Sequence, residues 1–306
     1  MITRRTFLRR TAQLAGLGVG AGAGVGGYAS IIEPRFRVQV TPWTVEHASW
    51  PAATPPLKIA IITDMHVIEP WTPVSHIEHV VEMANALKPD ITVLLGDFVP
   101  SWGIQQWSTH LVPVPEWTGA LGRLRARFGV YAVLGNHDWW DADVRVLRKE
   151  FKAVGIPVLE NQTVKIDQDG YRFWVAGLGD QIAHYLGHHR FRGADDLPGT
   201  LRPTMRDKDP VILLAHEPDI FVRVPDRVTV TLCGHTHGGQ VWLPYIGSPI
   251  VPSAYGQRFI YGHIVEGGRN LVVAAGLGMT GVPVRFMVPP EIALVTVTAP
   301  GSVPIA

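Results

Sequence analysis

Short apolar runs separated by amphipathic stretches follow one another along the chain after residue 56. Each of five runs is about five residues long and is followed at once by polar side chains, a pattern typical of buried strands. The five runs are 59–63, 91–95, 130–134, 211–215 and 229–233. We expect one helix to begin after Thr72 and Pro73, where apolar residues recur at helical spacing, and another over 141–154.

The second half of the chain is richer in strands. The apolar or alternating segments there are 164–166, 171–176, 271–275 and 292–298. Strands that alternate with helices and are then followed mainly by strands predict an α/β fold with two packed sheets flanked by helices. Residues 57–306 are enough for one domain with a large core. The prolines between 51 and 56 favour a linker, which we expect over 33–56.

Metal-binding side chains directly follow the five apolar runs. In chain order the sequence reads D-x-H, G-D, G-N-H-D, a single H, and G-H-T-H. The candidate ligands are Asp64, His66, Asp97, Asn136, His216, His235 and His237. A single Asp or His at a strand end is commonly a turn residue or a helix cap, but five coincidences in order favour a site. The carboxyl ends of strands in an open α/β sheet converge on one crevice, so these residues can meet.

The ligand types indicate the chemistry of the site. Carboxylate, amide and imidazole groups together suit divalent Mn, Fe or Zn. Seven such groups are too many for one tetrahedral zinc ion. Two divalent ions that share one carboxylate would use all seven, and two ions about 3.5–4 Å apart form a clamp for displacement at phosphorus. The sequence therefore predicts hydrolysis of a phosphoester.

This ordered set of motifs resembles the calcineurin-like metallophosphoesterase family, and the match runs from about Leu57 to the C-terminus. The resemblance implies a four-layer αββα sandwich of two mixed β-sheets flanked by helices. It also implies that one metal ion is held by Asp64, His66 and His237, and the other by Asn136, His216 and His235. Asp97 would bridge the two ions, and His137 would act on the leaving-group oxygen without binding metal.

One position departs from the family pattern. Many relatives read G-D-x-x-D at the second motif, and that second Asp orients the catalytic histidine. Here Pro100 occupies the position, and proline cannot hydrogen-bond an imidazole. Asp138 or Asp141 could orient His137 instead, or His137 could act alone with a lower pKa.

The expected reaction is attack on phosphorus by a hydroxide that bridges the two metal ions, while His137 serves as general acid. Two divalent ions, two carboxylates and one hydroxide leave a net charge of about +1, which a monoanionic phosphodiester would neutralise. We therefore prefer a phosphodiesterase over a phosphomonoesterase or a pyrophosphatase acting on a nucleotide-linked lipid. A non-catalytic metal-binding envelope protein is the alternative from another class.

The N-terminus has the features of an export segment. Residues 3–9 read T-R-R-T-F-L-R, a twin-arginine pattern, and residues 14–32 are uncharged and rich in glycine and alanine. We expect residues 1–32 to engage the twin-arginine export machinery and to deliver the protein to the periplasm or the outer face of the cytoplasmic membrane. Residues 27–29 only loosely match a cleavage site, and residues 21–23 offer another. If it is left uncut, the segment 14–32 is just long enough to span a bilayer and would serve as a membrane tether.

The composition limits which kinds of substrate or partner the protein is expected to bind. Cys233 is the only cysteine, so no internal disulfide can form, which agrees with export in the folded state. After residue 30 the chain has 23 basic and 26 acidic residues, a net charge of about −3. No basic stripe remains for a nucleic acid, and a small-molecule or lipid phosphoester is the better expectation.

Two groups of residues near the motifs could contact a substrate. Trp102, Trp107, Trp139 and Trp140 follow the second and third motifs, and they either pack on their own loops or form an apolar wall. A loop rich in histidine and arginine is either a solvated surface loop or a site for phosphate or an extra metal ion. Its residues are His184, His188, His189, Arg190 and Arg192.

Overall fold

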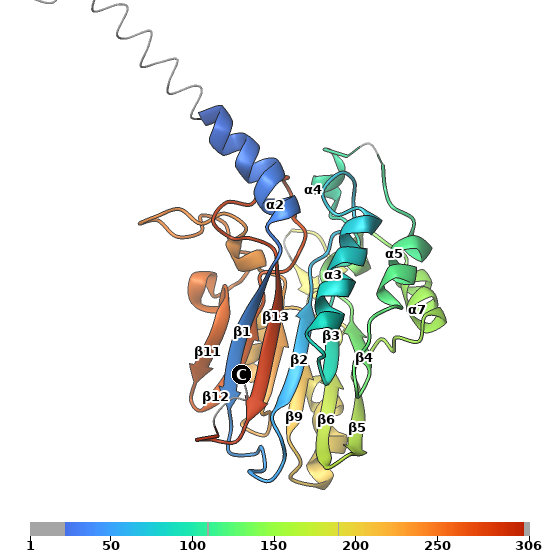
Figure 1. Cartoon of the computed structure of the whole chain (residues 1–306), viewed down its shortest axis with the longest axis vertical. Helices are drawn as coiled ribbons and strands as arrows, with labels where there is room; N and C mark the ends of the chain where they lie inside the picture. Colours follow the sequence, from blue (N-terminus) through green and yellow to red (C-terminus); the bar gives the residue numbers. More distant parts are fainter. Residues whose placement is uncertain (1–21, 109, 189, 303–306) are drawn as a thin grey trace, which may run out of the picture.

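The computed structural model describes residues 22–108, 110–188 and 190–302 (Figure 1). The twin-arginine residues, the first part of the apolar N-terminal segment and His189 lie outside the described residues. Two mixed sheets pack face to face at the centre of the fold, with helices on their outer faces (Figure 1). This arrangement confirms the predicted α/β fold.

The first sheet has five strands in the order β1-β13-β2-β3-β4. They are β1 (Gln39–Glu46), β13 (Glu291–Thr298), β2 (Leu57–Ile62), β3 (Ile91–Leu95) and β4 (Val130–Val133). β2, β3 and β4 run parallel, whereas β13 pairs antiparallel with β2 and parallel with β1. The carboxyl ends of β2, β3 and β4 therefore lie at one edge of the sheet.

The second sheet has six strands in the order β11-β12-β10-β9-β6-β5. They are β11 (Gly262–Glu266), β12 (Arg269–Val273), β10 (Val230–Cys233), β9 (Val211–Leu214), β6 (Tyr171–Gly177) and β5 (Gln162–Gln168). The four central strands run parallel, and β5 and β11 close the two edges antiparallel. A two-stranded hairpin, β7 (His184–Tyr185) and β8 (Phe191–Arg192), stands apart.

Three apolar clusters hold the layers together. The central cluster joins the facing sides of the sheets, with Ile59 and Val93 from the first and Ile212 and Val272 from the second. A second cluster packs the first sheet against α3 (Val74–Ala86), α5 (Val114–Leu121) and α7 (Val144–Ala153). A third packs the other sheet against α8 (Leu197–Leu201) and the turn Pro218–Arg223. Alternate residues of each strand thus face different layers.

The expected linker over 33–56 is corrected by the structure. Residues Gln39–Glu46 form β1, which pairs with β13 along its whole length. β1 lies at the edge of its sheet, and Val45 is the only fully buried residue in it. An edge strand lacks a strong apolar alternation and tolerates Pro42, so its sequence does not stand out as a strand. Only the proline-rich part after β1 connects two elements.

The N-terminal helical segment packs on the domain. It runs from residue 22 through Tyr28–Ile32 to α2 (Glu33–Phe36). The Ala29 carbonyl accepts a hydrogen bond from the Arg285 backbone N–H, at 2.8 Å. The Trp71 indole donates to the Ser30 carbonyl, and buried Glu33 accepts from the Val288 N–H. Along the described ranges, no helix has both the length and the apolarity needed to cross a bilayer.

Candidate metal centre

The seven candidate ligands meet where the carboxyl ends of the two sheets adjoin. The first sheet supplies Asp64 and His66 after β2, Asp97 after β3, and Asn136 at the start of α6 (Asn136–Trp140). The second sheet supplies His216 after β9, and His235 and His237 after β10. Two compact groups result, Asp64 with His66 and His237, and Asp97 with His216 and His235. Each group could hold one metal ion.

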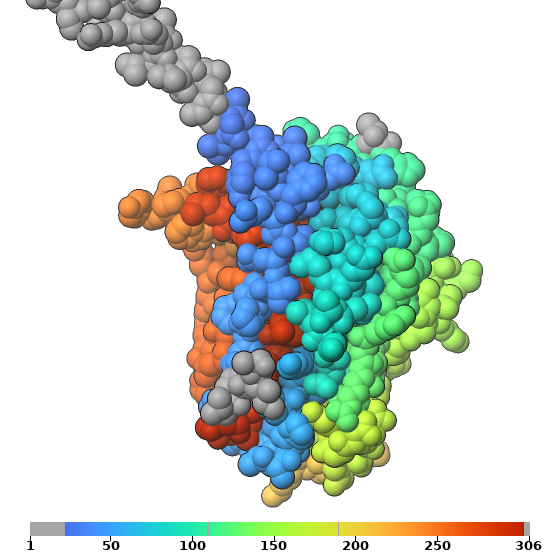
Figure 2. Space-filling view, in the orientation of Figure 1, coloured from blue at the N-terminus to red at the C-terminus, as the bar shows by residue number. Residues whose placement is uncertain are grey.

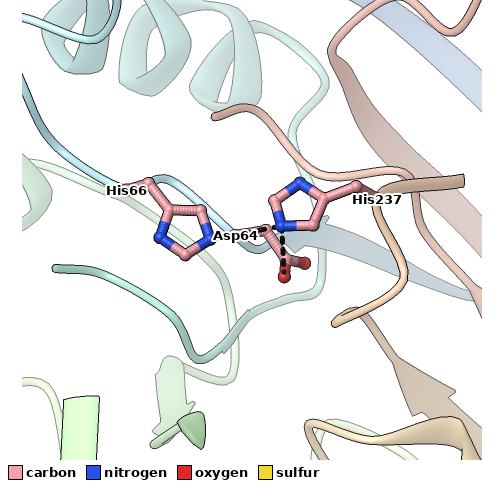
Figure 3. A group of neighbouring side chains, drawn as sticks. All are labelled: Asp64, His66 and His237. Atoms are coloured by element: carbon pink, nitrogen blue, oxygen red, sulfur yellow. Dashed lines mark hydrogen bonds and ion pairs between the residues drawn. The ribbon is translucent and has the colours of Figure 1, made fainter. Parts of the chain in front are cut away.

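The first group brings three acceptor atoms close together (Figure 3). The Nε2 atoms of His66 and His237 are 3.2 Å apart, and Asp64 Oδ1 lies 3.6 Å from His237 Nε2. His66 Nδ1 donates to the Val99 carbonyl at 2.9 Å. That bond fixes the proton on Nδ1, so Nε2 of His66 directs its lone pair into the group.

The second group repeats this design. His216 Nδ1 donates to the Leu95 carbonyl at 2.6 Å, which leaves Nε2 to face inward. Nε2 lies 3.2 Å from both Asp97 Oδ2 and His235 Nδ1. The buried Asn136 Oδ1 beside them has no hydrogen-bond partner among the described residues. Converging acceptors that lack donors fit divalent cations.

Burial controls the charge of these groups. It lowers the pKa of His66 to about 4 and the pKa of His237 well below its ordinary value, so both imidazoles are neutral at neutral pH. A neutral imidazole is the form that binds metal. Burial also raises the pKa of Asp64 to about 6, against the opposing charge of His216. A bound cation would favour the ionised form of this carboxylate.

The backbone at the ligands is strained. Asp64, His66, Asp97, His235 and His237 all have positive φ angles, between 40° and 70°. This left-handed region is unfavourable for residues other than glycine, and it persists only where surrounding contacts impose it. The His235 N–H supplies such a contact across the two sheets, because it donates to both oxygens of Asp64 at 3.0 Å. Five of the seven ligand positions therefore show the local strain typical of functional sites.

Two motif glycines are required by close packing. A Cβ atom on Gly135, the first residue of G-N-H-D, would lie 2.5 Å from Asp97 Oδ1 and 2.7 Å from His216 Cε1. A Cβ atom on Gly234, the first residue of G-H-T-H, would collide with the side chains of Thr63 and Asp64. Both glycines thus let the backbone of one motif approach the ligands of another.

Asp141 orients His137. Its Oδ2 atom accepts a 2.7 Å hydrogen bond from His137 Nδ1, so Nε2 of His137 is left facing Thr280 Oγ1 at 3.5 Å. Asp138 instead accepts backbone N–H groups of the second and third motifs. These donors are Asp97, Phe98, Val99 and Gly135. Of the two carboxylates considered from the sequence, Asp141 thus compensates for Pro100, while Asp138 holds the two loops together.

Arg285 is a supporting residue that the sequence did not reveal. It is fully buried, and its guanidinium donates to the carbonyls of Ala275, Gly276, Gly278 and Val288. The segment that it holds lies against Asp64, because the Gly278 N–H donates to the Asp64 carbonyl. The only signal in the sequence is an isolated arginine in an otherwise uncharged stretch, after the glycines that follow β12.

A cavity of about 420 Å³ opens above the ligands. It is lined by His137, Asn136, Asp97, His235 and His237, and also by Trp140, Phe191, Ser253 and Thr280. Glu217 and Asp219 also line it, and no lysine or arginine is present among the described lining residues. Glu217 follows His216 directly, but no pattern in the sequence distinguishes it as a site residue.

The tryptophans expected near the site behave differently from one another. Trp140 lines the cavity and stacks on Phe191, with ring centroids 5.4 Å apart. Trp139 packs between His184 and Arg148, away from the cavity. Trp102 and Trp107 are exposed and do not line the cavity. Only Trp140 forms part of an apolar wall.

The histidine- and arginine-rich loop forms the β7–β8 hairpin. His188, Arg190 and Arg192 are exposed, and His184 packs on Trp139. Neither His184 nor His188 belongs to the possible metal-binding groups found among the described residues. Phe191 is the residue of this hairpin that reaches the cavity.

Comparisons with known proteins agree with the motifs. Residues 57–239 match the calcineurin-like phosphoesterase family. The chain is 32% identical to the uncharacterized metallophosphoesterase YkuE of Bacillus subtilis, over 96% of this chain and 97% of that protein. It is 29% identical to the phosphodiesterase YaeI of Escherichia coli, over 91% and 93% of the two chains.

Two further comparisons cover a smaller share of the other protein or have a lower sequence identity. A transmembrane protein with a metallophosphoesterase domain from Bos taurus is 31% identical, over 75% of this chain and 50% of that protein. A dimetal phosphatase from Danio rerio is 12% identical with a TM-score of 0.42, over 73% and 88% of the two chains. The family match and the YkuE similarity show that this chain belongs to the calcineurin-like phosphoesterase family.

Proposed function

We propose that the protein hydrolyses phosphoesters with two divalent metal ions and that phosphodiesters are its preferred substrates. The observation that carries this proposal is the convergence of seven buried or half-buried acceptor residues from both sheets. Asp64, His66 and His237 would hold one ion, and Asn136, His216 and His235 the other. Asp97 would be shared, because its Oδ2 lies 3.2 Å from His216 Nε2 and 3.6 Å from His66 Nε2.

The side chains of the protein supply orientation and the proton. Two bound divalent ions would activate water and neutralise charge on the phosphoryl oxygens. Asp141 fixes the proton on Nδ1 of His137 and stabilises the imidazolium form. Burial lowers the pKa of His137, but the charge of Asp97 and the hydrogen bond with Asp141 outweigh it and raise the pKa above its ordinary value. His137 therefore retains a proton that it can donate to the leaving oxygen.

The charges around the cavity support a preference for diesters. Asp180 keeps its proton, because burial and the neighbouring Glu217 raise its pKa well above the ordinary value. Burial disfavours ionisation of Glu217, but the neighbouring protonated Asp180 holds its pKa below the ordinary value, so Glu217 is ionised. Glu217 and Asp219 repel a dianionic phosphomonoester more strongly than a monoanionic diester. YaeI, a relative of similar length, is named a phosphodiesterase.

The twin-arginine residues and the uncharged segment after them support export of the folded, metal-loaded protein. Folded export would let the ions be inserted before the protein meets a different pool of metals. The periplasm or the outer face of the cytoplasmic membrane is the proposed location.

The reaction and its metal requirement can be tested together. The wild-type chain is expected to contain two ions and to hydrolyse bis-p-nitrophenyl phosphate faster than p-nitrophenyl phosphate. Asp97→Asn should lose metal and more than about 100-fold in rate, since even residues that only support ligands contribute 10–100-fold. Asp169→Asn, on the exposed β5–β6 turn, is the control. Two retained ions with normal turnover in Asp97→Asn would disprove the shared ligand, and metal without turnover on mono-, di- or pyrophosphate esters would favour the non-catalytic alternative.

His137→Ala separates proton donation from metal binding. A positioned general acid contributes about 10²- to 10⁴-fold when the leaving group needs a proton. We expect a loss of that order on alkyl phosphodiesters, a much smaller loss on p-nitrophenyl esters, and two ions still bound. Equal losses on both substrates would assign His137 to charge stabilisation, and loss of metal would place it among the ligands.

Asp141→Asn tests what sets the pKa of His137. The general acid acts in its protonated form, so activity falls as pH rises through its pKa. Removing the carboxylate removes a contribution that raises this pKa, so the alkaline limb of kcat/KM should move to lower pH. Asp143→Asn is the matched control, because Asp143 caps α7 and bonds Arg145 instead of His137. An unmoved alkaline limb in Asp141→Asn would contradict the assigned role.

Changing Arg4 and Arg5 together to lysine tests the export route. The double variant should remain in the cytoplasm with unchanged specific activity, since both residues precede the domain. The measurement is an activity assay of the separated cytoplasmic and exported fractions of the cells. Normal export of the double variant would rule out the twin-arginine route.

A further inference from the structure

Three segments at one end of the domain have exposed apolar side chains and almost no charge. They are the segments that follow β3 and β10 and the stretch around the end of β12, namely 98–115, 238–257 and 270–290. Charged residues make up 17% of the chain, so a stretch of twenty residues would ordinarily contain roughly three. The first two segments contain none, and the third contains only the buried Arg285.

Hydrogen bonds join the three segments into one surface. Thr280 Oγ1 donates to Ser101 Oγ at 3.0 Å, and Gln240 Nε2 donates to the Thr280 carbonyl at 3.2 Å. The Phe286 N–H donates to the Gln240 carbonyl at 3.1 Å. The segments are therefore neighbours in space, although they are far apart in the sequence.

Large apolar side chains project from this surface, which we call the apolar end. Among them are Trp102, Trp107, Tyr245, Ile246, Ile250 and Val282. In Figures 1 and 2 an orange segment, part of 238–257, extends outward at the end of the domain where the blue N-terminal helix joins it. Exposed apolar side chains that gather on joined segments are typical of a binding site for a protein or a membrane.

The apolar end adjoins the metal centre. A second cavity, of about 370 Å³, lies between them. The exposed Ile250 and Val282 line it, and His237 and Thr280 belong both to it and to the cavity above the ligands. A molecule with a phosphoester head and an apolar tail could therefore span from the metal centre to the apolar end.

The N-terminal segment indicates what kind of partner binds to the apolar end. Residues 11–32 contain no charged residue, and the described part of this stretch is helical. The helix joins the apolar end through the bond between Ala29 and Arg285 and through Glu33, which accepts from Val288. Tryptophan and tyrosine prefer the interface between lipid and water. We propose that the apolar end docks on the surface of a lipid bilayer, with the metal centre facing the lipid head groups.

This contact can be measured independently of the reaction. Cys233 is buried and is the only cysteine, so a cysteine placed on the surface can be labelled selectively. We would attach an environment-sensitive fluorophore to Ile246→Cys in the full chain and add vesicles of phosphatidylethanolamine and phosphatidylglycerol. Met205→Cys is the matched control, since Met205 and Ile246 are both 67% exposed and Met205 precedes β9, at the opposite end of the strands.

Docking predicts a blue shift and a gain of emission for the probe at 246 on addition of vesicles, with little change at 205. A probe at Trp107→Cys, on another segment of the apolar end, should respond in the same way as the probe at 246. Equal responses at 246 and 205, or no response at either, would overturn the proposal. A shift at 246 that appears without vesicles and grows with protein concentration would assign the surface to a second copy of the chain instead.

Discussion

The burial of ionisable side chains where the two sheets meet is the constraint on which the site depends. Asp64 and Asp97 are almost completely removed from water, together with the imidazoles of His66, His216 and His237. Burying charge without compensation is costly, so buried charges are paired or bind metal. Two cations would compensate both carboxylates and use the imidazole lone pairs. The raised pKa of Asp64 and the lowered pKa values of His66 and His237 show that burial disfavours the charged forms of these side chains.

The same constraint explains the unusual backbone of the motifs. Ligands that must converge from two sheets leave their strands through sharp turns, and positive φ angles at Asp64, Asp97 and His235 provide those turns. The strain is offset by bonds between the layers. The His235 N–H donates to Asp64, and the Leu277 N–H donates to the Thr63 carbonyl. The strained turns are held by hydrogen bonds between the layers. The geometry of the metal centre therefore depends on how the two sheets pack.

The sequence predicted those parts of the structure that rest on strong local patterns. Buried strands such as β3 are continuous apolar runs, and the residues after them are chemically distinctive, so both could be identified. The edge strand β1 could not, because its stability comes from pairing with β13. The choice between Asp138 and Asp141 also needed coordinates, since both are carboxylates near His137 and only their direction differs. Arg285 was missed because its role is to bind backbone carbonyls, which leaves no signature in side-chain chemistry.

The distribution of charge also limits how a substrate reaches the centre. A cleft that captures anions from bulk water uses a positive rim to raise their local concentration. Here the cavity is lined by Glu217 and Asp219, the segments of the apolar end contain no exposed charge, and the chain after residue 30 has a net charge of about −3. Long-range attraction of an anion is therefore weak. A substrate concentrated on a lipid surface does not need such attraction, because docking of the apolar end already places the metal centre beside it.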